Sequence, residues 1–297
     1  MNYNFAILII SHERPECSTY SFLREHGYTG KIVILIDDKD ACIDEYKEKY
    51  KEQVVVFDKD KVELDLMDNF DGPKSIATYA REQCMVVAKE QNLDCFIMID
   101  DDLKNIKLRK GKSVTKKISN LDDIFDNCVD YLMQTKLDVL GFGTDEDYIG
   151  GKSDDFKLGI ATNIYLIKVN SNIHFRGRYT EDRIMFLEGQ QIGKAIMKTT
   201  KIHTSFNVWR SDKKTNKGGC QDAYGIDKTY QMYFYPVIAT PNISFIRVSD
   251  ILVNGEQRVT STTKRHSFPK IISGRYKKWK DLQFLFYHTE EQILYQL

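Results

Sequence analysis

The chain has 297 residues, of which 42% are hydrophobic and 29% charged, and its 43 basic and 43 acidic residues cancel to zero net charge. These values are typical of a globular protein with a sizeable core, built as one large domain or two small ones. The neutral balance excludes a whole-molecule attraction to nucleic acid or membrane, but it leaves room for a local basic face.

The cysteines and the N-terminus indicate the compartment. None of the six cysteines forms a CxxC pair, so a zinc knuckle is not expected. The apolar run 5–10 is too short for a signal peptide, and no stretch approaches membrane-spanning length. We therefore expect a reducing, cytoplasmic location and no membrane contact.

Apolar runs and amphipathic segments alternate through the first hundred residues. Continuous apolar runs of strand length predict strands buried on both faces, at 5–10, 31–36, 54–57 and 95–99. The segments between them predict helices, at 17–26, 40–51 and 74–91. This β-α-β-α-β-α-β order predicts a parallel α/β sheet with right-handed crossovers, whose polar strand ends gather at one edge.

Three carboxylates, Asp100-Asp101-Asp102, directly follow the fourth predicted strand. Open α/β sheets bind ligands outside the carboxyl ends of their strands. The Asp-x-Asp spacing places Asp100 and Asp102 on the same side of an extended backbone, where they repel each other unless a cation lies between them. Oxygen ligands suit Mg²⁺ or Mn²⁺, with a phosphate in the open positions. A solvated acidic turn is the alternative interpretation, and the motif alone does not decide.

Polar residues also follow the first and second predicted strands, so we expect them at the same edge. The residues expected to contact a nucleotide there are Ser11, His12, Arg14, Asp37 and Asp38, with Asp100 and Asp101 beside the diphosphate. Arg81, on the 74–91 helix, could pair with the acidic strand end, reach the ribose or form a structural salt bridge. Neither a GxGxxG nor a GxxxxGK[ST] motif occurs in the sequence. What remains is nucleotide binding through an acidic strand end and a metal, as in a nucleotide-sugar transferase.

The second half predicts one helix and further strands, together with three polar clusters. The helix spans 120–135 with Asn120 as its N-cap, and the strands lie at 139–143, 158–168, 201–209, 231–237 and 243–248. The basic run 103–117 has seven lysines and arginines and no acid, which is typical of a solvated loop but could contact a polyanion. The loop around Lys217 and Gly218 is either an anion-binding lid or an ordinary surface loop. Glu181 and Asp182 follow Thr180, which fits helix capping.

Ten short runs, taken together and in this order, resemble the TET-associated glycosyltransferases, a phage-type family found beside enzymes that oxidise methylpyrimidines in DNA. The runs are FAILIISHERPE, GYTGKIVILIDD, VVVFDK, DNFDG, IATYAREQC, FIMIDDDL, DYIGGK, GRYTEDRIMF, SDKKTNKGGCQDAYG and KRHSFPKII. The resemblance implies a GT-A-type, Rossmann-like fold with a mostly parallel sheet flanked by helices. It also implies a nucleotide-sugar donor (a UDP-sugar), Mn²⁺ or Mg²⁺, a hydroxymethylated pyrimidine of phage DNA as acceptor, and the host-cell cytoplasm as location.

The same resemblance assigns the remaining site residues. A hydroxymethyl group is a poor nucleophile until a base removes its proton, and the resemblance gives this role to Asp182, with Glu181 as the alternative. Transfer with retention of configuration would not require such a base. His266 is implied as a metal ligand together with Asp100 and Asp102, since imidazole suits Mn²⁺ better than Mg²⁺. Lys264 would offset charge on the leaving diphosphate.

We expect a catalytic domain over 1–255 and a basic C-terminal extension over 256–297 that completes the site and packs as a helix. Between 258 and 280 there are eight lysines and arginines and no acid, and Tyr276 and Trp279 are interleaved with them. This pattern fits either nucleic-acid contact or the outer face of a C-terminal helix whose buried side includes Leu282, Phe284, Leu285 and Tyr287. Other functions remain open: a glycan or protein acceptor, a nucleotidyltransferase, which usually has a glycine-rich phosphate loop, or a non-catalytic binding module, which the intact Asp-x-Asp disfavours.

Overall fold

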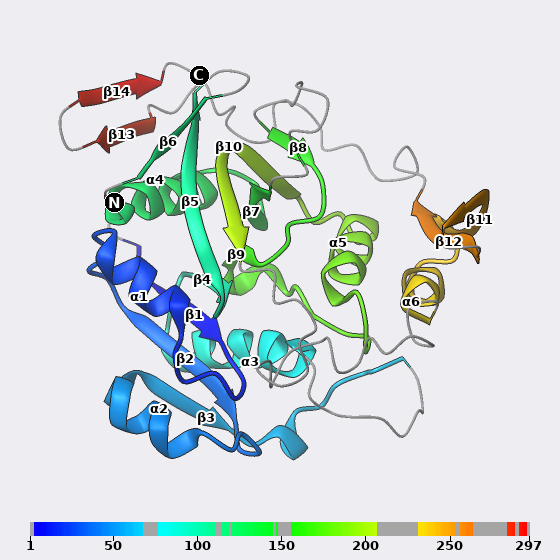
Figure 1. The fold of residues 1–297 in the computed structure, drawn as a ribbon, viewed down its shortest axis with the longest axis horizontal. Helices are drawn as coiled ribbons and strands as arrows, with labels where there is room; N and C mark the ends of the chain where they lie inside the picture. Colours follow the sequence, from blue (N-terminus) through cyan, green and yellow to red (C-terminus); the bar gives the residue numbers. More distant parts are fainter. Residues whose placement is uncertain are drawn as a thin grey trace.

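The N-terminal half forms four parallel strands and three helices, as the sequence predicts (Figure 1). The computed structural model describes residues 3–67, 77–110, 114–118, 120–144, 147, 156–206, 231–253, 256–263, 284–288 and 291–295. The strands are β1 (Phe5–Ile10), β2 (Ile32–Asp37), β3 (Val54–Phe57) and β4 (Cys95–Asp100). The helices are α1 (Ser18–Glu25), α2 (Ile43–Tyr50) and α3 (Ala77–Glu90), with short 3-10 turns at Lys51–Gln53 and Lys59–Lys61.

The second half extends the same sheet with strands of both directions. These strands are β5 (Leu103–Lys110), β6 (Val114–Lys117), β7 (Val139–Thr144), β8 (Phe156–Leu158), β9 (Ile164–Lys168) and β10 (Ile196–Phe206). Within the described ranges the sheet has ten strands in the order β3-β2-β1-β4-β9-β7-β10-β5-β6, with β8 paired to β10. Because β9 runs antiparallel to both β4 and β7, the sheet is parallel up to β4 and mixed beyond it.

Helices and two separate hairpins complete the described chain. The helices are α4 (Leu121–Gln134), α5 (Glu181–Gln191) and α6 (Gln231–Ala239), with a 3-10 turn at Val169–Ser171. The hairpins pair β11 (Ser244–Val253) with β12 (Glu256–Thr263), and β13 (Phe284–His288) with β14 (Glu291–Tyr295). None of the described helices is long and apolar enough to cross a membrane.

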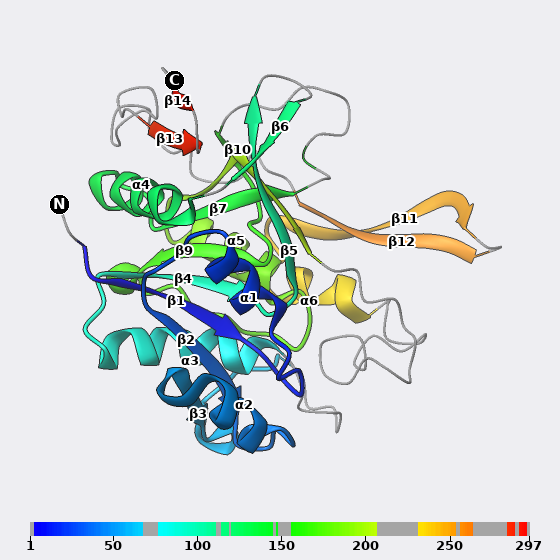
Figure 2. The same cartoon turned by 60° about the vertical axis from the view of Figure 1, so that its left-hand side comes forward.

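Both faces of the central strands are buried, which explains their continuous apolar runs (Figure 2). On β1, Ile7 and Ile9 pack into the core cluster that includes residues of α1, α2 and α4. Ala6 and Leu8 alternate with them and join the opposite cluster, which includes residues of α3 and α5. The helices therefore cover the sheet from two sides, and the polar strand ends are left at its edge.

The basic segment after Asp102 is a correction to the sequence prediction. Where a solvated loop was the typical interpretation, the structure has the strands β5 and β6, paired antiparallel. Ile106 and Leu108 are buried at alternate positions, and this period of two is what holds the strand against the core. The sequence prediction missed this alternation because the segment is rich in lysine and arginine.

Two further predictions of secondary structure were wrong. The apolar run 231–237 forms helix α6 rather than a strand, even with Pro236 inside it, because a short apolar run cannot be assigned by periodicity alone. The C-terminal helix expected to bury Phe284, Leu285 and Tyr287 is replaced by the hairpin of β13 and β14, in keeping with the strand preference of aromatic residues. The domain boundary expected after residue 255 stays a prediction.

Candidate active site

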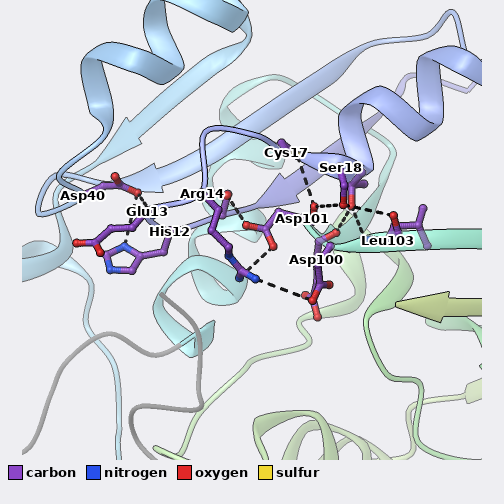
Figure 3. Close-up of polar contacts among 12 residues, drawn as sticks. His12, Glu13, Arg14, Cys17, Ser18, Asp40, Asp100, Asp101 and Leu103 are labelled. Atoms are coloured by element: carbon purple, nitrogen blue, oxygen red, sulfur yellow. Dashed lines mark hydrogen bonds and ion pairs between the residues drawn. The ribbon is translucent and has the colours of Figure 1, made fainter. Parts of the chain in front are cut away.

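The three aspartates at the C-terminal end of β4 have different partners, and Figure 3 shows Asp101 facing Arg14. The register of the parallel sheet sets Asp100 beside Ile10, so the loop that begins at Ser11 lies next to the acidic turn. Asp101 is buried, accepts a hydrogen bond from the hydroxyl of Ser11 and forms an ion pair with Nη2 of Arg14 at 3.0 Å. Asp102 lies 3.9 Å from Nη1 of Arg14 and is the more loosely held of the two carboxylates that Arg14 faces.

The start of α1 fixes the backbone of the acidic turn. The amide of Thr19 donates to the carbonyl of Asp101 at 3.1 Å, and the Thr19 hydroxyl donates to the carbonyl of Asp100 at 2.6 Å. The Ser18 hydroxyl also donates to the carbonyl of Asp101, at 3.1 Å. Sequence reasoning missed both residues, although a Ser-Thr pair at a predicted helix start is a recognisable signal for local hydrogen bonding. The turn is therefore held in place independently of any bound ligand.

The electrostatics of the turn favour a bound cation. Burial raises the pKa of Asp101 to about 6, against the opposing effect of Arg14. Burial, reinforced by the charges of Asp100 and Asp101, raises the pKa of Asp102 to about 7. A carboxylate whose ionised form is this poorly compensated gains from a nearby divalent ion. The residues present thus fit a metal at Asp102.

The complete ligand set expected from the sequence is not assembled in the described ranges. There, no group of three or more His, Cys, Asp or Glu side chains is arranged to hold a metal ion. The carboxylate of Asp100 accepts two hydrogen bonds from Nη2 of Arg81, at 3.0 and 3.3 Å. The expected ligand His266 and the expected anion-binding residues Lys217, Gly218 and Lys264 lie outside the described residues.

A second polar cluster lies at the ends of β1 and β2. Nδ1 of His12 is 3.1 Å from Asp37 and 3.6 Å from Asp40, and Nζ of Lys59 is 3.4 Å from Asp37. The hydrogen bond to Asp37 raises the pKa of His12 above its ordinary value, although burial works against it. Asp38 instead accepts from the amide of Lys59 and sits nearer the surface. The sequence predicted His12 and Asp37 here but missed Asp40 and Lys59.

Arg81 connects the acidic turn to α5. Its guanidinium is buried, donates through Nε to Glu181 at 3.0 Å and through Nη2 to Asp100, and lies 5.3 Å from the centre of the Tyr165 ring. Of the roles left open by the sequence, the structure contains two: the ion pair with the acidic strand end and a structural salt bridge, which Arg81 forms with Glu181. One buried cation therefore joins the end of β4 to the first residue of α5.

Glu181 and Asp182, at the start of α5, differ in their surroundings. Glu181 is occupied by Arg81, whereas one carboxylate oxygen of Asp182 accepts from the amide of Arg183 at 2.7 Å. Burial and the neighbouring charge of Glu181 raise the pKa of Asp182 to about 6. Thr180 occupies the N-cap position, as predicted, with both acids in the first turn, but its φ of 56° is left-handed and its side chain makes no capping hydrogen bond.

One face of α3 holds the segment that leads into α5. The Thr78 hydroxyl donates to the carbonyl of Gly177 at 3.0 Å, and Glu82 accepts from the amide of Phe175 at 2.8 Å. Together with Arg81, these residues occupy positions i, i+3 and i+4, which share one helix face. The approach to Glu181 and Asp182 is thus fixed by side chains of a helix almost a hundred residues earlier in the sequence.

Gly177→Ala should destabilise the protein more than Gly193→Ala. Both glycines have left-handed φ values, 86° and 81°, so each substitution costs about 1–2 kcal/mol. A Cβ at Gly177 would also meet Cδ1 of Ile184 at 2.6 Å, while one at Gly193 meets nothing within 4 Å. We expect about 1–3 kcal/mol of additional destabilisation at Gly177, measured as the free energy of unfolding in urea. Equal effects at the two positions would contradict the packing argument.

Comparisons with known proteins give weak structural similarity and a clear family assignment. Glucosyl-3-phosphoglycerate synthase from Mycobacterium tuberculosis, solved with Mn²⁺, UDP and its glucosylated product, is 9% identical, with a TM-score of 0.47 over 89% of this chain and 88% of that chain. Mannose-1-phosphate geranyltransferase from Thermus thermophilus is 6% identical, with a TM-score of 0.37 over 69% and 76%. No curated protein sequence matches the chain. Residues 5–219, more than half of the chain, match the family described as TET-Associated Glycosyltransferase, and this protein belongs to that family of glycosyltransferases.

Proposed function

We propose that this enzyme transfers a hexosyl or pentosyl group from a UDP-sugar to the hydroxymethyl group of a modified pyrimidine in DNA. One observation carries the proposal. The buried guanidinium of Arg81 connects two clusters of acidic residues, Asp100–Asp102 and Glu181–Asp182. The family's association with enzymes that oxidise methylpyrimidines supports the acceptor. The UDP and Mn²⁺ bound by the mycobacterial synthase suggest the donor and the metal.

On the donor side, Asp102 would hold the divalent ion, whose chemistry is to neutralise charge on the leaving diphosphate. Arg14 lies between Asp101 and Asp102 and supplies further positive charge at this edge. The loop from Ser11 to Arg14 and the cluster of His12 with Asp37 would contact the nucleoside. Asp101 acts indirectly, because its buried contacts with Ser11 and Arg14 fix the shape of the loop.

On the acceptor side, Asp182 is the proposed general base. Glu181 is the weaker candidate, since its carboxylate is committed to Arg81 inside the protein. With a pKa of about 6, Asp182 is ionised at neutral pH and close to the range in which a general base works well. It would accept the proton of the attacking hydroxymethyl group as the new glycosidic C–O bond forms and the bond from the anomeric carbon to the diphosphate breaks, which releases UDP. This role belongs to transfer with inversion of configuration.

Asp182→Asn should lower kcat by about 10²- to 10⁴-fold, the usual contribution of a general base. In the unsubstituted enzyme the rate should fall as the pH drops through about 6, because protonated Asp182 can no longer take the proton of the attacking hydroxyl group. The variant should lose this acidic limb. Asp44→Asn, on α2, is the control and should keep both rate and pH profile. An unchanged profile in Asp182→Asn would exclude Asp182 as the base and leave Glu181 as the base or a retaining mechanism.

A transfer assay tests the function directly. The protein is incubated with Mn²⁺ and each of several labelled nucleotide sugars, with hydroxymethylcytosine DNA, unmodified DNA, or no acceptor. We expect label only in the modified DNA, and most efficiently from a UDP-sugar. Donor hydrolysis without label in DNA would leave the glycosyltransferase in place but contradict the acceptor, and would direct the search to glycans and proteins. Label incorporated as a nucleotide would indicate a nucleotidyltransferase.

A further inference from the structure

Three adjacent strands of the sheet are strongly basic in a chain whose net charge is zero. Strand β5 pairs with β6 on one side and with β10 on the other (Figure 1). Together these strands contain eight lysines and arginines and not one aspartate or glutamate. The whole chain has equal numbers of basic and acidic residues. The positive charge of these three strands is therefore balanced by acidic residues elsewhere in the chain.

The strand register increases the repulsion instead of relieving it. Lys107 on β5 lies directly across from Lys117 on β6 and, on its other side, from His203 on β10. Like charges directly opposite each other destabilise an antiparallel pair. Lysines on β6 have a structural explanation, because charge on an edge strand prevents pairing with another chain. That explanation does not extend to Lys107, since β5 is paired on both sides.

Lys104 and Lys107 lie where a large ligand can reach them. Ile106 and Leu108 face the core cluster that includes α4, so Lys107 belongs to the opposite face, where it is partly exposed. Lys104 is exposed at the point where the register between β5 and β10 shifts. Within the described ranges, neither ammonium group has a carboxylate partner. Both charges are therefore available for a ligand.

This basic strand starts at the candidate active site. Leu103 directly follows Asp102, so β5 leads away from the proposed metal position. With a rise of about 3.3 Å per residue, Lys104 and Lys107 lie roughly 7 and 16 Å along the strand from Asp102. A ligand that contacts both lysines would extend from the reaction centre over several repeat units. A mononucleotide or a single sugar is too short to do so.

We propose that Lys104 and Lys107 contact consecutive phosphates of the acceptor DNA strand and hold it along β5. The inference rests on the proposed function, in which the acceptor base is part of a DNA chain. A phosphodiester backbone is the fitting partner because it repeats one negative charge per nucleotide, and lysine ammonium groups bind it without regard to sequence. The repulsion between aligned lysines is relieved when phosphates lie over them.

The test replaces both lysines, in Lys104→Gln/Lys107→Gln, and measures DNA binding against salt. Binding of a labelled hydroxymethylcytosine duplex is followed by fluorescence anisotropy between 50 and 200 mM salt. The slope of log affinity against log salt should become shallower by nearly two, at about 0.9 for each phosphate that is no longer neutralised. An unmodified duplex should show the same change. The control Lys47→Gln/Lys89→Gln removes the same charge from exposed positions on α2 and α3, and should keep the original slope.

Two readouts separate this inference from the proposed function. Transfer to a free hydroxymethyl nucleoside, which has no phosphate chain, should be unchanged in the double variant. Its melting temperature should be equal or higher, since a like-charge row has been removed. If the unsubstituted enzyme modifies DNA while the double variant keeps the full salt slope, the inference is wrong and the function stands. If the unsubstituted enzyme transfers sugar to no DNA, the acceptor is wrong and the inference is overturned with it.

Discussion

Asp102→Asn should lower glycosyl transfer by about a thousandfold and weaken Mn²⁺ binding in the absence of substrate. Of the two carboxylates that Arg14 faces, Asp102 is the more distant, and burial together with the charges of Asp100 and Asp101 raises its pKa to about 7. A bound cation contributes several kcal/mol of charge stabilisation to the transfer, and each 1.36 kcal/mol is a tenfold change in rate. The amide is close in size to the carboxylate, so the fold should remain intact.

Mn²⁺ binding is measured by the decrease of the free-ion signal in electron paramagnetic resonance, with and without UDP. The control is Asp101→Asn, which removes a charge one residue away but from a buried position that faces Ser11 and Arg14. That variant should unfold at lower urea concentration yet retain more Mn²⁺ affinity than Asp102→Asn. If Asp102→Asn binds Mn²⁺ as well as the unsubstituted protein, Asp102 is not a metal ligand.

Arg81→Met should destabilise the fold by about 3–5 kcal/mol. The substitution keeps most of the side-chain volume but leaves the carboxylates of Asp100 and Glu181 without their shared cation, and breaking a buried ion pair from one side typically costs this much. Arg81→Lys should be less destabilising, since it keeps the charge, although one ammonium group cannot reproduce the two-sided geometry of the guanidinium. The free energy of unfolding in urea measures both.

Lys89→Met, on an exposed position of α3, is the matched control and should change stability by less than about 0.5 kcal/mol. A second variant tests the cause. Adding Glu181→Gln to Arg81→Met removes one of the uncompensated charges and should recover part of the stability. A cost below about 1 kcal/mol for Arg81→Met, or no recovery in the double variant, would show that the ion pairs contribute little.

The positions of residues that directly follow the strands were predictable from the sequence, because in a parallel sheet the carboxyl ends of neighbouring strands meet at one edge whatever the exact packing of the helices. Once the alternation of strands and helices is recognised, His12, Asp37 and Asp100 must reach one edge of the sheet. The same reasoning gave the strand limits of the N-terminal half to within a residue. A regular pattern of buried residues thus predicts both the limits of a strand and the edge of the sheet at which the following residues lie.

Contacts made by helices across the fold were not predictable in this way. That Arg81 reaches Glu181, or that Thr78 reaches Gly177, depends on the packing angle of α3 against the segment before α5. Nothing in either local sequence encodes that angle. The strands of the basic segment were missed for a related reason. Lys104 and Lys107 are charged residues, and lysine is uncommon in strands, so the local sequence favours a solvated loop.

The hydrogen bonds between α3 and the segment that leads into α5 limit where this enzyme can be joined to a relative in a chimera. Thr78, Arg81 and Glu82 precede the acidic turn in the chain, yet their partners are Gly177, Glu181 and Phe175. A chimera joined anywhere between β4 and β9 would take the two sides of every one of these contacts from different parents. The start of α5 is therefore not part of a detachable C-terminal module: an exchange that keeps the positions of Glu181 and Asp182 has to carry α3 along with them.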